Sequence, residues 1–232
     1  EHFCILHRAD CQGENFKLPG TLLDPKLLME DEIRRIRKKA GPKIKAILGT
    51  KGFYGTAAMI QQFKSHVLCL LESSAGAIFH ASQSHLESLD RMQTHFVEAI
   101  GLTEGEAFLS FNLAPLKLRR DIAILGLLHR VQLGEVHPDF QNLFPRDSRP
   151  RAATRHTARR HGKQFQEIRG NSHYFNHSVF GATRIYNVLP AYAVKAGDVG
   201  SFQSLLTKDA RFQCKVGSAS WIRMYCCRAR LV

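Results

Sequence analysis

The chain has 232 residues, of which 44% are hydrophobic and 23% charged, so it can bury a sizeable core as an ordinary globular protein does. Its formal net charge is +13 and its isoelectric point is near 9.8. This basic excess favours a polyanionic partner, with nucleic acid ahead of an anionic membrane. No signal-peptide pattern is visible, and the longest apolar run, residues 122–128, is too short for a membrane span. We therefore expect a soluble nuclear or cytoplasmic protein with no membrane partner.

Residues 1–23 are expected to form a β-hairpin, because apolar residues are concentrated in residues 3–6 and 16–23 with a polar segment between them. Asp24, followed by a proline, is typical of a helix N-cap. A basic helix is then expected from about residue 30 to 40, with acids in its first turn and bases in its last. The pair Gly41–Pro42 is expected to end this helix, and a short second helix to end at Gly49.

Apolar residues recur at helical spacing in three further segments. They predict helices over residues 56–72, 84–100 and 117–133. The last of these is apolar on most faces, as a buried central helix is. Before it, Thr103 and Glu106 form the capping-box pattern of a short helix. Arg119 and Arg120, at the start of the apolar helix, are interpreted as partners of neighbouring carboxylates.

The composition changes after residue 145, where the core domain is expected to close. Residues 146–170 are rich in arginine and poor in apolar residues, which predicts a basic linker. Apolar residues return between residues 174 and 206, which indicates some order, whereas residues 209–232 show no clear period; the segment 171–232 as a whole stays poorly defined. The predicted fold is mainly α: a helical bundle over residues 24–145, with a small N-terminal β-hairpin (1–23) and a basic, partly disordered C-terminal tail.

Patterns of catalytic or metal-binding residues are weak. The six cysteines include no Cys-x-x-Cys pair, so free thiols in a reducing compartment are expected. Cys214, Cys226 and Cys227 lack the spacing of a zinc knuckle. His173 and His177 have the i, i+4 spacing of a helical metal site but lack the glutamate of His-Glu-x-x-His. We expect no metal site and no convergent catalytic set in this chain.

Three stretches carry a resemblance to a known family. The first is N-F-K-L-P-G-T-L-L-D-P-K-L from Asn15, the second covers residues 86–128, and the third is Y-N-V-L-P from Tyr186. They resemble the non-LTR (LINE-type) retrotransposon reverse transcriptases, especially copies from dinoflagellate genomes. The first is similar to the strand that ends the palm and leads into the thumb, and the second to the helices after the thumb. The likeness is closest over residues 16–145. Pro19 departs from it, since the family usually has leucine before the glycine.

The resemblance implies a thumb-like helical bundle that contacts an RNA/DNA hybrid or RNA through its backbone. Lys17 and Gly20 match the strand that holds the primer end. The implied phosphate contacts come from the basic helix: Arg34, Arg35, Lys38, Lys39, Lys43 and Lys45. Arg155, Arg159 and Arg160 are candidates for a nucleic-acid-binding arm in the linker. Backbone contacts of this kind hold nucleic acid without reading its sequence.

The catalytic residues of such a polymerase are not expected here. The family's Tyr/Phe-x-Asp-Asp box, which binds Mg²⁺, would lie upstream of Glu1, in the palm and fingers with which this segment would associate. The chain is therefore expected to be a fragment of an RNA-directed DNA polymerase, without cofactor or polymerase activity of its own. Two alternatives stay open: a basic helical module that binds protein or acidic lipid, and a non-functional retroelement remnant. The basic helix face and the linker can also be solvated surfaces without a partner.

Overall fold

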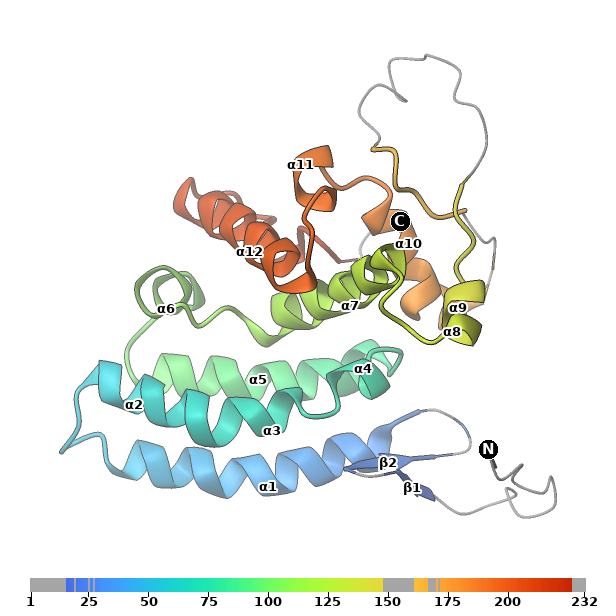
Figure 1. Ribbon diagram of the computed structural model, residues 1–232. Coiled ribbons are helices and arrows are strands. Elements are labelled where there is room, and N and C mark those ends of the chain that lie inside the picture. Colours follow the sequence, from blue (N-terminus) through green and yellow to red (C-terminus); the bar gives the residue numbers. More distant parts are fainter. Residues whose placement is uncertain are drawn as a thin grey trace.

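The computed structural model describes residues 16–18, 20–24, 26, 28–147, 161–166, 170 and 172–226. It confirms the mainly helical fold with a short N-terminal hairpin (Figure 1). After the hairpin, the first group of elements is α1 (Glu30–Gly49), α2 (Thr56–Phe63), the π-helical η1 (Lys64–Leu68), α3 (Cys69–Glu72), α4 (Ala75–Ile78) and α5 (Gln83–Ala99). The second group is α6 (Glu104–Phe111), α7 (Leu116–Leu133), α8 (Pro138–Asn142), α9 (His173–Asn176), α10 (Val179–Tyr186), α11 (Ala191–Val194), α12 (Val199–Lys215) and the 3-10 helix η3 (Trp221–Arg223).

The described hairpin lies wholly within residues 16–23, whereas the prediction joined this segment to residues 3–6. Strand β1 (Phe16–Leu18) pairs antiparallel with β2 (Thr21–Leu23), with Phe16 opposite Leu23. Gly20 lies in the connecting turn with φ of 91°, a backbone conformation that glycine adopts without strain. The other predicted strand, residues 3–6, lies outside the described residues.

The predicted break at Gly41–Pro42 is wrong, because α1 continues through Pro42 to Gly49. A proline removes one helical hydrogen bond, whereas Ala40 before it and Ile44 and Ile47 after it remain buried on one face of the helix. Burial of this continuous apolar face outweighs the lost bond. The prediction that Asp24 is the N-cap also differs from the structure, since the helix begins at Glu30 and Asp24 accepts hydrogen bonds from the Leu28 and Met29 amides at 3.1 and 2.6 Å.

The other predicted helices are confirmed with small changes at their ends. Residues 56–72 are helical throughout as α2, η1 and α3, and residues 83–99 form α5. The capping box that begins α6 is complete: Thr103 Oγ1 accepts from the Glu106 amide at 3.2 Å, and the Thr103 amide donates to Glu106 at 2.8 Å. Local sequence signals therefore decided most of these helix boundaries.

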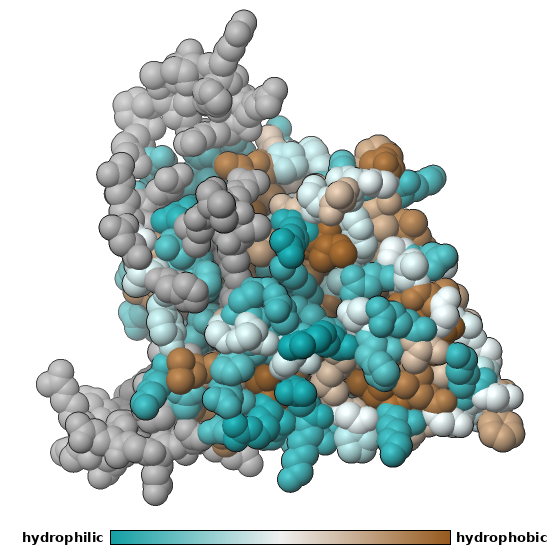
Figure 2. All heavy atoms as spheres, turned by 180° about the vertical axis from the view of Figure 1, so that it is seen from behind, coloured by the Kyte–Doolittle hydropathy of each residue, from teal (hydrophilic) through white to brown (hydrophobic). Residues whose placement is uncertain are grey.

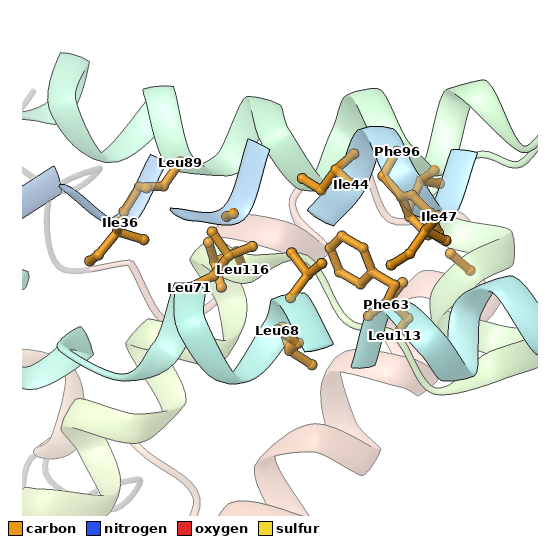
Figure 3. Packing of buried hydrophobic residues seen from close by; sticks show 14 of the residues in the cluster. Ile36, Ile44, Ile47, Phe63, Leu68, Leu71, Leu89, Phe96, Leu113 and Leu116 are labelled. Atoms are coloured by element: carbon orange, nitrogen blue, oxygen red, sulfur yellow. The ribbon is translucent and has the colours of Figure 1, made fainter. Parts of the chain in front are cut away.

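Two hydrophobic clusters form the interior. In the first, α1 packs on the layer formed by α2, α3 and α5. Figure 3 shows Ile44 and Ile47 of α1 directed toward Phe63 and Phe96. The rings of Phe63 and Phe96 stack with their centroids 4.3 Å apart, and both side chains are fully buried. This cluster fixes α1 so that its opposite face is turned to solvent.

Helix α7 lies between the two clusters, as expected for a helix that is apolar on most faces. Its first residue, Leu116, belongs to the first cluster, and Leu118 and the apolar residues after it belong to the second. Helices α10 and α12 cover α7 from the other side, and α11 packs against α12 (Figure 1). The poorly defined segment 171–232 thus contributes a packed helical layer in its described part, and the expected domain end at residue 145 does not coincide with a break in packing.

The Tyr186–Asn187 pair, part of the third stretch of resemblance, organises the second cluster. Tyr186 is fully buried, and its hydroxyl lies 2.8 Å from His129 Nδ1. His129 Nε2 lies 3.1 Å from the Ala196 carbonyl, so Nε2 carries the proton and Nδ1 accepts from Tyr186. The Asn187 side chain bonds both the amide and the carbonyl of Phe165 at 2.9 Å, which anchors the described end of the linker.

Replacing Tyr186 with phenylalanine should destabilise the protein. The Tyr186→Phe variant keeps the ring but leaves His129 Nδ1 buried without a donor, at an expected cost of about 1–3 kcal/mol in the free energy of unfolding. Urea unfolding followed by circular dichroism measures it. Tyr192→Phe, at a half-exposed tyrosine, is the matched control, and an equal loss in both variants would contradict a specific role for the buried pair.

Candidate nucleic-acid interface

Helix α1 places its basic residues on the side opposite its buried face. Figure 2 shows hydrophilic side chains along the lower edge of the molecule, where α1 lies in Figure 1. The exposed cations are Arg34, Arg37, Lys38, Lys39, Lys43 and Lys45. Within the described residues, only Arg34 of these forms an ion pair. Most of the positive charge of α1 therefore faces solvent, and no carboxylate of the described ranges pairs with it.

The helical repeat sorts these cations into two rows. With 3.6 residues in a turn, Arg34, Lys38 and Lys45 fall on nearly one line, which extends over roughly 16 Å of helix axis. Arg37 lies beside this line on the flank toward α5. Lys39 and Lys43, four residues apart, form a second and shorter row on the other flank. The longer row is the larger continuous positive surface of the helix.

A shallow depression of about 520 Å³ lies along this row. It is lined by Arg34, Arg37, Lys38 and Gly41 of α1 and by Met92 of α5. A side chain built at Gly41 would meet open space, so the glycine leaves the helix backbone accessible between the cations. The depression has positive walls and an apolar edge, a shape into which a phosphodiester backbone can settle.

Arg34 and Arg35 are adjacent in sequence but have different environments. Arg34 is exposed and pairs with Glu30 at 2.6 Å and Asp31 at 3.0 Å, and such surface pairs contribute little and exchange readily. Arg35 bonds the fully buried Glu32 at 2.6 Å and the Gly20 carbonyl at 2.6 Å. Arg35 therefore joins the hairpin to α1, and its guanidinium is committed to these contacts.

Glu32 is the centre of this junction. Besides Arg35, its carboxylate accepts from Ser74 Oγ at 2.6 Å and from the Leu22 amide at 3.0 Å. Burial by itself would raise the pKa of Glu32, but these three hydrogen bonds outweigh it and hold the pKa below its ordinary value. The carboxylate is thus ionised at neutral pH and ties together the hairpin, α1 and the loop before α4.

The remaining predicted contacts divide between the hairpin and the linker. Lys17 lies in β1 opposite Leu22, and its side chain is outside the described residues. Gly20 is exposed in the turn, with its carbonyl held by Arg35. Arg155, Arg159 and Arg160 fall outside the described residues. The structure therefore brings Gly20 and Arg35 together at one end of α1 and collects the exposed cations along it.

Two exposed aromatic residues at the other end of α1 were not predicted as part of a site. Phe53 is 88% exposed and Tyr54 is 50% exposed, in the loop that directly follows the helix. The sequence carries this feature as Lys51-Gly-Phe-Tyr-Gly, directly after the basic helix. Exposed aromatic rings beside cations are typical stacking platforms for unpaired bases.

The arginines at the start of α7 confirm their predicted structural role. Arg119 forms a two-pronged ion pair with Glu72, one arm of it at 3.0 Å, and buried Arg120 pairs with Asp90 at 2.8 Å. Across the described ranges, no group of three or more His, Cys, Asp or Glu side chains is placed to hold a metal ion. No helix in the same residues is long and apolar enough to cross a membrane.

Comparison with known proteins gives no match: no family model, no curated protein and no solved structure matches this chain.

Proposed function

We propose that this protein binds the backbone of a nucleic-acid duplex, and that α1 provides the main contact. The observation that carries the proposal is the row of exposed, largely unpaired cations on α1, fixed by the buried face on its other side. Because the row extends over roughly 16 Å and a duplex carries a charge about every 1.7 Å of its axis, the row faces several phosphates at once.

The proposal follows the resemblance to the thumb of LINE-type reverse transcriptases. In that setting the duplex is an RNA/DNA hybrid of primer and template, and the upstream palm and fingers supply the Mg²⁺-binding carboxylates. Phe53 and Tyr54 add a second contact, on which bases of the single-stranded template can stack where it leaves the duplex. A duplex is favoured over an acidic membrane because the cations lie in a line beside a depression rather than around an apolar helix face.

The salt dependence of binding tests the proposal. A fluorescein-labelled RNA/DNA hybrid with a short template overhang is titrated with the protein, and anisotropy gives Kd between about 50 and 200 mM salt. Four phosphate contacts, one for each cation of the longer row and its neighbour Arg37, predict a slope of about −3.6 in a plot of log K against log salt.

The alternatives give different results in the same assay. A salt slope shallower than about −1 would contradict backbone binding. Equal affinity for the hybrid and for an acidic peptide of the same net charge would contradict it as well. Tighter binding to vesicles that contain phosphatidylserine than to the hybrid would favour a lipid partner instead. A chain that fails to unfold cooperatively in urea would support the non-functional remnant.

A further inference from the structure

A second cleft lies on the part of the molecule away from α1. Its volume is about 570 Å³, and it is bordered by α3, α4, α7 and α12. In Figure 1, α12 is separated from α1 by the layer of α2, α3 and α5, so the cleft and the α1 face are separate surfaces. The volume lies within the range of about 300–1,000 Å³ that is typical of small-molecule sites.

Positive charge predominates in this cleft. Four cations line it, Arg119, Arg120, Lys208 and Arg211, against one acid, Glu72. Arg119 is paired with Glu72, and Arg120 is paired with Asp90, which does not line the cleft. Lys208 forms no ion pair within the described part of the chain, and Arg211 donates to the Leu109 carbonyl, which is uncharged. Among the described residues, these two exposed cations of the cleft lining thus have no carboxylate partner.

The close approach of α12 to α7 gives the cleft its polar wall. A Cβ added at Gly126 of α7 would lie 2.2 Å from Gln203 Nε2, so the Gln203 side chain of α12 occupies the space beside this glycine. Ser204, Lys208 and Arg211 follow at spacings of four and three residues and so lie along one side of α12. The floor is apolar, formed by Ala114, Ile122 and Ala123. Hydroxyl, ammonium and guanidinium donors thus line the same cleft as an apolar patch.

We propose that this cleft binds a nucleotide-sized ligand through its phosphate monoester group. Lys208 and Arg211 contact the phosphate oxygens, since lysine and arginine are the usual phosphate-binding side chains and charge-assisted bonds are the strongest available to them. Ser204 supplies a neutral donor beside them. The apolar floor takes the base or sugar, which a bare inorganic anion lacks. The inference does not rest on the α1 interface, because none of these residues belongs to α1.

Isothermal titration calorimetry with adenosine 5′-monophosphate tests the proposal on the full chain. We expect saturable binding, no heat from adenosine alone, and weaker binding of inorganic phosphate than of the nucleotide. Lys208→Gln should weaken nucleotide binding about tenfold, as expected for loss of one charge-assisted contact. The matched control is Lys215→Gln, which removes an exposed lysine of the same helix that does not line the cleft.

A free nucleotide and a nucleic-acid end are distinguished by a tetranucleotide with and without its 5′-phosphate. Tighter binding of the phosphorylated tetranucleotide than of adenosine 5′-monophosphate assigns the cleft to a strand end, and the reverse order assigns it to free nucleotides. Equal effects of Lys208→Gln and Lys215→Gln, or no saturable binding of either phosphorylated ligand, would overturn the proposal. The triple α1 variant described below keeps the cleft intact, so failure of one site leaves the other testable.

Discussion

Replacing Arg37, Lys38 and Lys45 together with glutamine should weaken binding of the RNA/DNA hybrid roughly 100-fold near 0.1 M salt and reduce the salt slope by about 3. Each of these cations is exposed on α1 and forms no ion pair within the described residues. Their loss therefore removes phosphate contacts without breaking an internal bond. The fall in affinity should be similar for hybrids of different sequence, because backbone contacts carry no base information.

The control for this variant changes the same number of charges elsewhere. Arg130, Lys195 and Lys215 are exposed and lie outside α1, so glutamine at all three lowers the net charge equally. If general positive charge were responsible for binding, both triple variants would lose affinity to the same extent. A reduction in slope confined to the α1 variant assigns the contact to the helix, and an unchanged slope in that variant would show that the duplex binds elsewhere.

The second large effect is expected on stability. Glu32→Ala should lower the free energy of unfolding by about 3 kcal/mol, because it removes the buried partner of the ion pair with half-buried Arg35 and leaves Ser74 Oγ and the Leu22 amide without this acceptor. Chemical denaturation measures the loss. Glu30→Ala breaks the exposed pair with Arg34 on the same helix and should cost less than about 1 kcal/mol.

The contribution of Glu32 should also depend on pH. Its pKa is lowered in the folded protein, so the unfolded chain binds the proton more tightly. The stabilisation is present above the ordinary pKa of 4.5 and is lost as the pH falls through the lower folded value. Glu32→Gln keeps the size of the side chain but cannot titrate. The stability difference between the unaltered protein and Glu32→Gln should therefore shrink below about pH 4.5, whereas a constant difference would exclude the ion pair as its source.

Sequence patterns predicted the helices in which the apolar residues recur at a regular spacing. The helices over residues 56–72, 84–100 and 117–133 present their apolar residues at helical spacing, and the Thr103–Glu106 box marks its own helix start. The break at Gly41–Pro42 was wrong because local propensity was outweighed by burial of residues on both sides of the proline. Helices α10 and α12 were not predicted. The buried residues of α12, Phe202, Leu206 and Ala210, recur every four residues, but this stripe has only three members and one of them is a small alanine.

The candidate site was predictable in outline only. The charge run on α1 identified the helix, but the run itself does not distinguish Arg34 from Arg35. Arg35 lies one residue further along the helix than Arg34 and therefore faces Glu32. The Glu32 carboxylate is held by Ser74, which is distant in sequence, and by the Leu22 amide of the hairpin. The exposure of Phe53 and the cleft beside α12 depend likewise on how distant segments pack.

The position of α7 between two hydrophobic clusters has a consequence for how the protein can be divided. Its first turn helps to close the cluster beneath α1, and its later turns, with Leu125 and Leu128, are covered by α10–α12. Cutting the chain near residue 145 would remove these C-terminal helices and expose an apolar face along most of α7. Such a surface is prone to self-association. The basic surface of α1 and the C-terminal helices are far apart in sequence, but they thus belong to one structural unit.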